Sequence, residues 1–207
     1  MKATNADVRR VFDRFADRYD PLMARWERLL FPGSREWVAG HARGLVVEIA
    51  VGTGLNLPLY PAGTKVIGIE LSEPMLKVAR ARVAAAGLGD RVELRQGDVQ
   101  ALELADGCAD TVISTFALCT IPDPQAAVGE AYRVLRPGGR FVLAEHGPSS
   151  VAVVRAGMRM LEPLTVRTGA DHLTRDPRPL LERAGFTIES VARAKLGISF
   201  RVVATRP

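Results

Sequence analysis

The chain has 207 residues, which is ordinary for one domain and short of two average domains. Hydrophobic residues make up 47% of it and charged residues 25%, so disordered, collagen-like and coiled-coil classes are excluded. The formal net charge is +5, but the arginines are dispersed along the chain and do not form a block. A nucleic-acid-binding stripe is therefore not indicated.

No stretch of the chain approaches the roughly 18 to 20 consecutive apolar residues of a membrane span. The first twenty residues are charged throughout and lack the apolar core of a signal peptide, so we expect a cytoplasmic protein. Cys108 and Cys119 have no companion pair, and His41, His146 and His172 are too scattered for a helical metal pair. We expect neither a disulfide framework nor a metal site.

Three helices are predicted before the first strand. Apolar residues recur with helical spacing from Val8 to Tyr19, and Asp20-Pro21 is expected to end this helix. A second helix follows from Leu22 to Leu30, closed by Pro32-Gly33, and a third runs from Ser34 to about His41. Residues 8–30 are apolar on one side and contain interspersed arginines, so this segment could also contact a membrane surface.

Strands and helices then alternate, which is the pattern of a doubly wound, mostly parallel α/β sheet of the Rossmann-like class. The predicted strands are residues 45–50, 66–70, 91–97, 111–115 and 140–145, and the predicted helices are residues 74–86 and 124–135. In the tail, residues 148–172 have a helical pattern and residues 180–184 form a short helix. The strands 186–194 and 199–205 are joined by four residues, so they should pair as an antiparallel hairpin.

The turn after the first strand contains Gly52-Thr53-Gly54. A dinucleotide fingerprint needs a third glycine where this chain has Leu57, which argues against a pyrophosphate site and a dinucleotide oxidoreductase. The backbone amides beyond the turn suit one carboxylate, and Glu48 just before it is placed to face an ammonium group. A glycine pair alone is often only a tight turn, so other residues have to specify the ligand.

Two acidic residues at the ends of the next strands indicate which ligand binds. Glu70 ends the second strand, where a carboxylate can accept both hydroxyls of a ribose. Asp98 follows the third strand, where it can accept from the exocyclic amine of adenine. Carboxyl ends of neighbouring parallel strands meet at one sheet edge, so these groups together describe S-adenosylmethionine.

These motifs, with Leu135-Arg136-Pro137-Gly138-Gly139 and Leu181-x-x-Ala184-Gly185-Phe186, resemble class I S-adenosylmethionine-dependent methyltransferases over nearly the whole chain. One departure is Ala50, where the family commonly has glycine. The resemblance implies that the cofactor contacts Glu48, Ala50, Gly52, Thr53, Gly54, Asn56, Glu70, Leu71, Met75, Gly97, Asp98, Val99 and Thr115.

The acceptor is predicted to be a small molecule. Leu118-Cys119-Thr120, Glu145-His146 and residues 172–175 look like alkyl-thiol methyltransferases, which favours S-methylation. Residues 68–76 are also similar to bacterial phospholipid N-methyltransferases and quinone C-methyltransferases, which remain alternatives. A noncatalytic S-adenosylmethionine-binding sensor is a remote one. The loop 115–119 lacks the motif that holds a flipped base, so no nucleic-acid acceptor is expected.

His146, after the fifth strand, is the first candidate for a general base, with a hydrogen-bonded structural role as the alternative. Cys119 is expected to pack beside the pocket. We expect one methyltransferase domain, with a helical lid (1–43), a cofactor core (44–147), a substrate cap (148–178) and a terminal helix with hairpin (179–207); its oligomeric state has no signal in the sequence. The predicted acceptor-binding residues are Phe12, Phe15, Tyr19, Met23, Cys119, His172 and Arg175.

Overall fold

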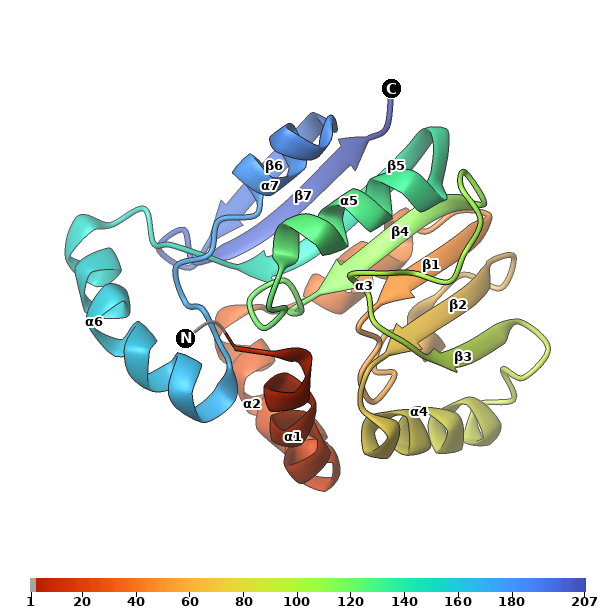
Figure 1. Ribbon diagram of the computed structural model, residues 1–207, viewed down its shortest axis with the longest axis horizontal. Coiled ribbons are helices and arrows are strands. Elements are labelled where there is room, and N and C mark those ends of the chain that lie inside the picture. Colours follow the sequence, from red (N-terminus) through yellow and green to blue (C-terminus); the bar gives the residue numbers. More distant parts are fainter. Residues whose placement is uncertain (1–2) are drawn as a thin grey trace.

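The computed structural model describes residues 3–207 and contains a seven-stranded sheet with the order β3-β2-β1-β4-β5-β7-β6 (Figure 1). Strands β1 to β5 run parallel to one another, and β7 is antiparallel to both β5 and β6. The doubly wound sheet with a terminal antiparallel hairpin is thus confirmed. Its strands are β1 (Leu45–Ile49), β2 (Lys65–Glu70), β3 (Val92–Gln96), β4 (Ala109–Thr115), β5 (Leu135–His146), β6 (Thr187–Ala194) and β7 (Ser199–Thr205).

Helices cover both faces of the sheet, which explains why the central strands read as continuous apolar runs. Successive residues of a strand point to opposite faces, so Val47 packs beneath α5 and α7 while Val46 packs beneath α3 and α4. None of the helices within residues 3–207 has the length and apolar character needed to cross a bilayer. The helices are α1 (Asn5–Phe15), α2 (Tyr19–Leu30), α3 (Ser34–His41), α4 (Glu73–Ala85), α5 (Pro124–Val134), α6 (Ala152–Gly169) and α7 (Arg178–Ala184), with short 3-10 turns at Ala16–Arg18 and Leu57–Leu59.

The predicted end of the first helix at Asp20-Pro21 is wrong. Helix α1 already ends at Phe15, a 3-10 turn follows, and α2 begins at Tyr19. Pro21 therefore lies in the first turn of α2, where a backbone N–H has no intrahelical acceptor and its loss costs nothing. Proline is found both in the first turn of helices and just after their ends, so Pro21 alone does not mark the end of a helix.

Strand β5 is longer than the predicted residues 140–145 because it begins at Leu135, which pairs with Ala109 before a register shift in β4. The predicted helix before it, 124–135, ends one residue earlier, at Val134. The helices predicted for residues 34–41 and 180–184 match α3 and α7 closely.

The N-terminal helices lie beyond the carboxyl ends of the parallel strands, where Figure 1 shows α1 and α2 between α4 and α6. Polar contacts hold them there. The Ser72 hydroxyl donates to Asp13 Oδ1 at 2.6 Å, and the Thr53 hydroxyl donates to Asp20 Oδ1 at 2.6 Å. The helices thus sit over the glycine turn and the start of α4.

Candidate cofactor and acceptor site

The turn after β1 brings backbone close to a cavity. Gly52 and Gly54 both have positive φ, +58° and +78°. A Cβ on Gly54 would lie 2.7 Å from the Leu57 side chain, whereas a Cβ on Gly52 would meet nothing within 4 Å. Gly54 therefore allows close packing, and Gly52 leaves its open side to a ligand. Ala50 also has positive φ (52°), a conformation that costs an L-residue roughly 1–2 kcal/mol.

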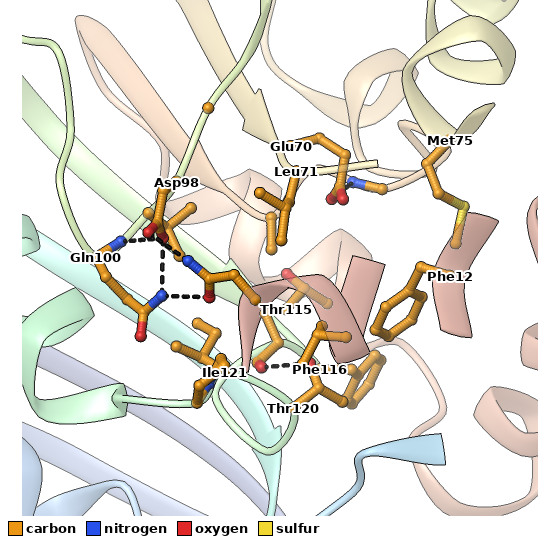
Figure 2. A pocket seen from close by; sticks show the side chains of 18 of the residues that line it. Phe12, Glu70, Leu71, Met75, Asp98, Gln100, Thr115, Phe116, Thr120 and Ile121 are labelled. Atoms are coloured by element: carbon orange, nitrogen blue, oxygen red, sulfur yellow. Dashed lines mark hydrogen bonds between the residues drawn. The ribbon is translucent and has the colours of Figure 1, made fainter. Parts of the chain in front are cut away.

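The cavity lies between this turn, the ends of β2, β3 and β4, and helix α1 (Figure 2). The predicted cofactor residues that line it are Ala50, Gly52, Glu70, Leu71, Met75, Gly97, Asp98, Val99 and Thr115. The predicted acceptor residues that line it are Phe12 and Tyr19. Further lining residues, which the sequence did not indicate, are Asn5, Val8, Gln100, Phe116, Ala117, Thr120, Ile121 and Pro122.

Glu70 is oriented by the backbone around it. Its Oε2 accepts from the Gly52 amide at 3.0 Å, and its Oε1 accepts from the Ser72 amide at 2.9 Å. Burial raises the pKa of Glu70, while these amides oppose the shift. Each carboxylate oxygen keeps a second lone pair, so the group can still accept from two ribose hydroxyls.

Asp98 is bonded to the N-terminal helix. Its Oδ2 accepts from Asn5 Nδ2 at 2.6 Å, and its Oδ1 accepts from the backbone and side-chain nitrogens of Gln100, both at 2.9 Å. Gln100 Nε2 also donates to Asn5 Oδ1 at 2.6 Å. Asn5 thus occupies the position that the sequence assigns to the adenine amine. More than ninety residues separate Asn5 from its partners, so no local pattern signals this contact.

Glu48 lies beneath the turn and does not line the cavity. Its carboxylate accepts from Asn56 Nδ2 and from the Tyr60 hydroxyl, both at 2.8 Å. Asn56 in turn donates to Thr115 Oγ1 at 2.9 Å and accepts from Arg35 Nη1 at 2.9 Å. Burial raises the pKa of Glu48 to about 7. Glu48 and Asn56 therefore support the turn from below, and Thr53 and Gly54 are also absent from the lining.

The remaining predicted acceptor residues lie outside the cavity wall. Phe15 is exposed, and Met23 does not reach the cavity. Cys119 is buried directly behind the lining residues Ala117 and Thr120. Arg175 donates to the backbone carbonyls of Leu118 and Ile121, so it fixes the loop after β4.

His146 is hydrogen-bonded on one side of its ring. Its Nε2 lies 3.0 Å from Asp171 Oδ1, and its ring lies 6.4 Å from that of Phe31. Burial lowers the pKa of His146, but the hydrogen bond and charge of Asp171 outweigh it, so the pKa is raised. His172 Nδ1 lies 3.5 Å from Glu162 Oε1. Neither histidine lines the cavity.

The donor set fits S-adenosylmethionine. Gly52 offers an open backbone approach, Glu70 and Asp98 present carboxylates at adjacent strand ends, and Met75 and Leu71 add apolar contacts. Asn5, which lines this cavity, is hydrogen-bonded to the Asp98 carboxylate.

Comparison with known proteins identifies the family. A methyltransferase domain model matches residues 47–143. A phosphatidylethanolamine N-methyltransferase from Cereibacter sphaeroides is 39% identical over 65% of the chain and 70% of its own length. A demethylmenaquinone methyltransferase from Symbiobacterium thermophilum is 35% identical over 72% of the chain, which spans only 63% of that enzyme. A human thiol S-methyltransferase is 28% identical over 92% of the chain and 79% of its own length.

Solved structures show the same fold. A methyltransferase structure from Thermotoga maritima superposes with a TM-score of 0.73 at 23% identity, covering 97% of this chain and all of that one. The chain therefore belongs to the S-adenosylmethionine-dependent methyltransferases. Within this family it is similar to enzymes named for small-molecule acceptors of three kinds.

Proposed function

We propose that the protein transfers a methyl group from S-adenosylmethionine to the sulfur of a small thiol. The observation that carries this proposal is the extent of the similarity. The match to the human thiol S-methyltransferase covers 92% of the chain, whereas the phospholipid match covers 65% and the quinone matches cover 67% to 77%. A match of that length has to include most of the residues outside β1 to β5 and the helices between them.

Methyl transfer from S-adenosylmethionine depends mainly on placing the acceptor next to the methyl group and needs few catalytic side chains. S-adenosylmethionine supplies a methyl group already activated on a sulfonium sulfur. Glu70 and Asp98 would hold the ribose and adenine, and Phe12, Tyr19 and Phe116 would exclude water from the reacting atoms. The acceptor reacts as its thiolate, and because even a free cysteine thiol has a pKa of about 8.5, the site has to favour loss of the thiol proton near neutral pH.

An acceptor panel tests this proposal. The protein is incubated with S-adenosylmethionine and, separately, with an alkyl thiol, phosphatidylethanolamine vesicles and a reduced quinone, and products are identified by mass spectrometry. The expected product is the methyl thioether, lost in Asp98→Ala and retained in a variant of the exposed Glu103. A methylated lipid or quinol without any thioether contradicts the assignment.

A phospholipid acceptor is the second candidate, and the surface around the acceptor side favours it. Helix α2 exposes large apolar side chains, and the 18-residue α6 has no buried residue at all. Arginines lie among these apolar residues, so the helix pair has the composition of a surface that contacts anionic lipid. The exposed apolar residues are Leu22, Trp26, Leu29, Val153, Met160, Leu161 and Leu164.

A further inference from the structure

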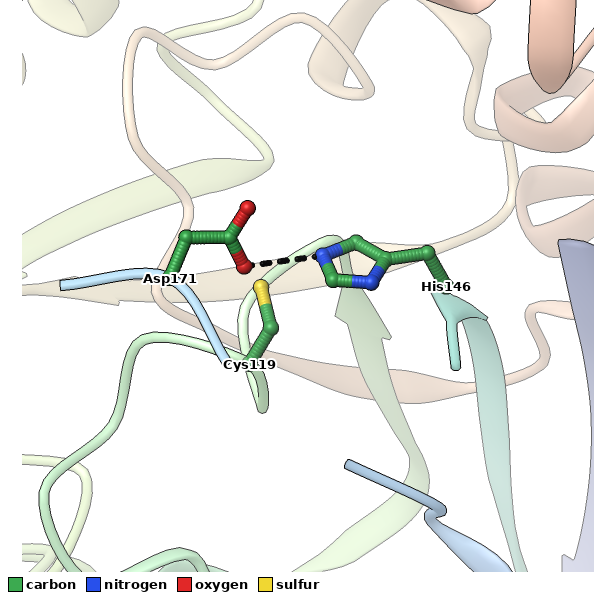
Figure 3. A group of neighbouring side chains, drawn as sticks. All are labelled: Cys119, His146 and Asp171. Carbon is green, nitrogen blue, oxygen red and sulfur yellow. Dashed lines mark hydrogen bonds and ion pairs between the residues drawn. The ribbon is translucent and has the colours of Figure 1, made fainter. Parts of the chain in front are cut away.

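Three side chains from separate segments, none of which lines the cavity, lie close together (Figure 3). Cys119 comes from the loop after β4, His146 ends β5, and Asp171 follows α6. Their Sγ, ring nitrogen and carboxylate oxygen all lie within 4.8 Å of one another. The His172 amide donates to the Cys119 carbonyl at 3.0 Å, which fixes one of these segments against another.

The arrangement differs from a proton relay. In a relay the nucleophile and the orienting carboxylate occupy opposite nitrogens of the histidine ring. Here His146 Nε2 is already bonded to Asp171 Oδ1, at 3.0 Å, and Cys119 Sγ lies beside this same contact (Figure 3). Three donor atoms of these kinds within 4.8 Å of one another can coordinate one metal ion.

Next to His146 in the chain is a buried carboxylate that is only partly satisfied. Glu145 is 1% exposed, and among the described residues its Oε2 has no hydrogen-bond partner. Its other oxygen accepts from the Ser114 hydroxyl at 2.6 Å and the Ala117 amide at 3.1 Å. The Arg175 guanidinium donates to the backbone carbonyls of Leu118 and Ile121 and does not pair with this oxygen.

We propose that Cys119, His146 and Asp171 form a zinc site with one coordination position left for a further ligand. Thiolate, imidazole and carboxylate are all ligands of Zn²⁺, at about 2.0–2.3 Å, and three protein ligands with an open fourth position are typical of catalytic zinc. The sequence alone argues against a metal because the three residues lie in different segments. Asp171, with a side chain 33% exposed, provides the entry route.

Cobalt substitution tests the site without any methyl donor. The metal-stripped protein is titrated with Co²⁺ under anaerobic conditions and followed by absorption. We expect one equivalent to give tetrahedral d–d bands and a thiolate-to-cobalt charge-transfer band, both removed by Zn²⁺. Cys119→Ser should remove the charge-transfer band, and Asp171→Asn should weaken binding at least tenfold. Cys108→Ser, which changes the other cysteine, should behave as wild type.

Two results would overturn the metal site. The first is the absence of the charge-transfer band, or its persistence in Cys119→Ser. If Cys119→Ser fails to fold, unchanged cobalt affinity in Asp171→Asn, whose wild-type side chain is 33% exposed, overturns the site instead. Methyl transfer to a thiol is measured separately, so its failure does not count against metal binding.

Discussion

Glu70 combines a fixed orientation with access to the cavity, because Gly52 and Ser72 amides hold its two oxygens. Replacing it with alanine should weaken S-adenosylmethionine binding by roughly 10- to 100-fold, since hydrogen bonds to a charged group contribute about 1.5–3 kcal/mol. Isothermal titration calorimetry measures this. Glu73→Gln, on the exposed first turn of α4, is the matched control. Equal affinity in Glu70→Ala would remove this residue from the site.

Glu48 should make stability depend on pH. Its folded pKa of about 7 exceeds the ordinary value of 4.5, so the folded state holds the proton more tightly than the unfolded state. As pH rises from about 4.5 to 7 the unfolded state releases its proton first, and the free energy of unfolding falls by up to about 3 kcal/mol. Above pH 7 this loss is complete.

Glu48→Gln should make that slope shallower, and urea unfolding at several pH values would measure the change. Glu70, whose pKa burial also raises, keeps its own contribution. The exposed Glu103→Gln is the control and should keep the wild-type profile. An unchanged slope in Glu48→Gln would assign the pH dependence to other buried groups.

The positions of site residues were predictable where a residue follows a strand end. Glu70 and Asp98 line the cavity because parallel strands end at one edge. Glu48 was assigned to the ligand on its position before the turn, but its partner Tyr60 lies twelve residues further on. Cys119, His146 and Asp171 meet only through tertiary packing. Sequence spacing carries no signal for such contacts.

Helix α1 is the element on which access to the site depends. Only Val8 is buried in it, yet Asn5 holds Asp98 and Phe12 lines the cavity. A helix with few buried side chains, held mainly by hydrogen bonds, can move away from the cavity at a low cost in free energy. We therefore expect S-adenosylmethionine to slow amide hydrogen exchange in residues 8–19. Identical exchange with and without ligand would assign α1 to the structural core.

Phe12 and Phe15 offer a matched pair on this helix. Phe12 lines the cavity and lies 6.4 Å from the Tyr19 ring, whereas Phe15 is 40% exposed. Phe12→Ala should lower kcat/KM for the acceptor by about tenfold or more, because part of the apolar wall is lost. Phe15→Ala should leave it near wild type. Steady-state kinetics with the acceptor identified by the panel decides between them.

The positions of the helices and strands were predictable except where a proline can either end a helix or lie in its first turn. The strand and helix alternation from Leu45 to Glu145 follows from apolar patterning and glycine stops. Pro21 misled the prediction because proline both ends helices and occupies their first turn. The 3-10 turn at 16–18 has no distinctive composition, so the division into α1 and α2 was not foreseeable.

At the scale of the whole molecule, stability rests on two apolar layers on opposite faces of one sheet. Phe141 in β5 is fully buried and packs against Phe186 at a ring-centroid distance of 5.5 Å. Phe141→Ala should reduce the free energy of unfolding by about 3–5 kcal/mol. Val153→Ala, 83% exposed on α6, should change it by less than about 0.5 kcal/mol. Urea denaturation of both variants measures the contrast.

Strand β7 is the last strand of the chain but lies inside the sheet, between β5 and β6. During synthesis the backbone of β5 consequently stays without a neighbour on that side until residues 199–205 leave the ribosome. Strand β6 is synthesised before β7 and likewise has no pairing partner until β7 is complete. Unpaired strand edges are prone to associate with other chains. A nascent chain stalled before Ser199 is therefore the form of this protein in greatest need of a chaperone.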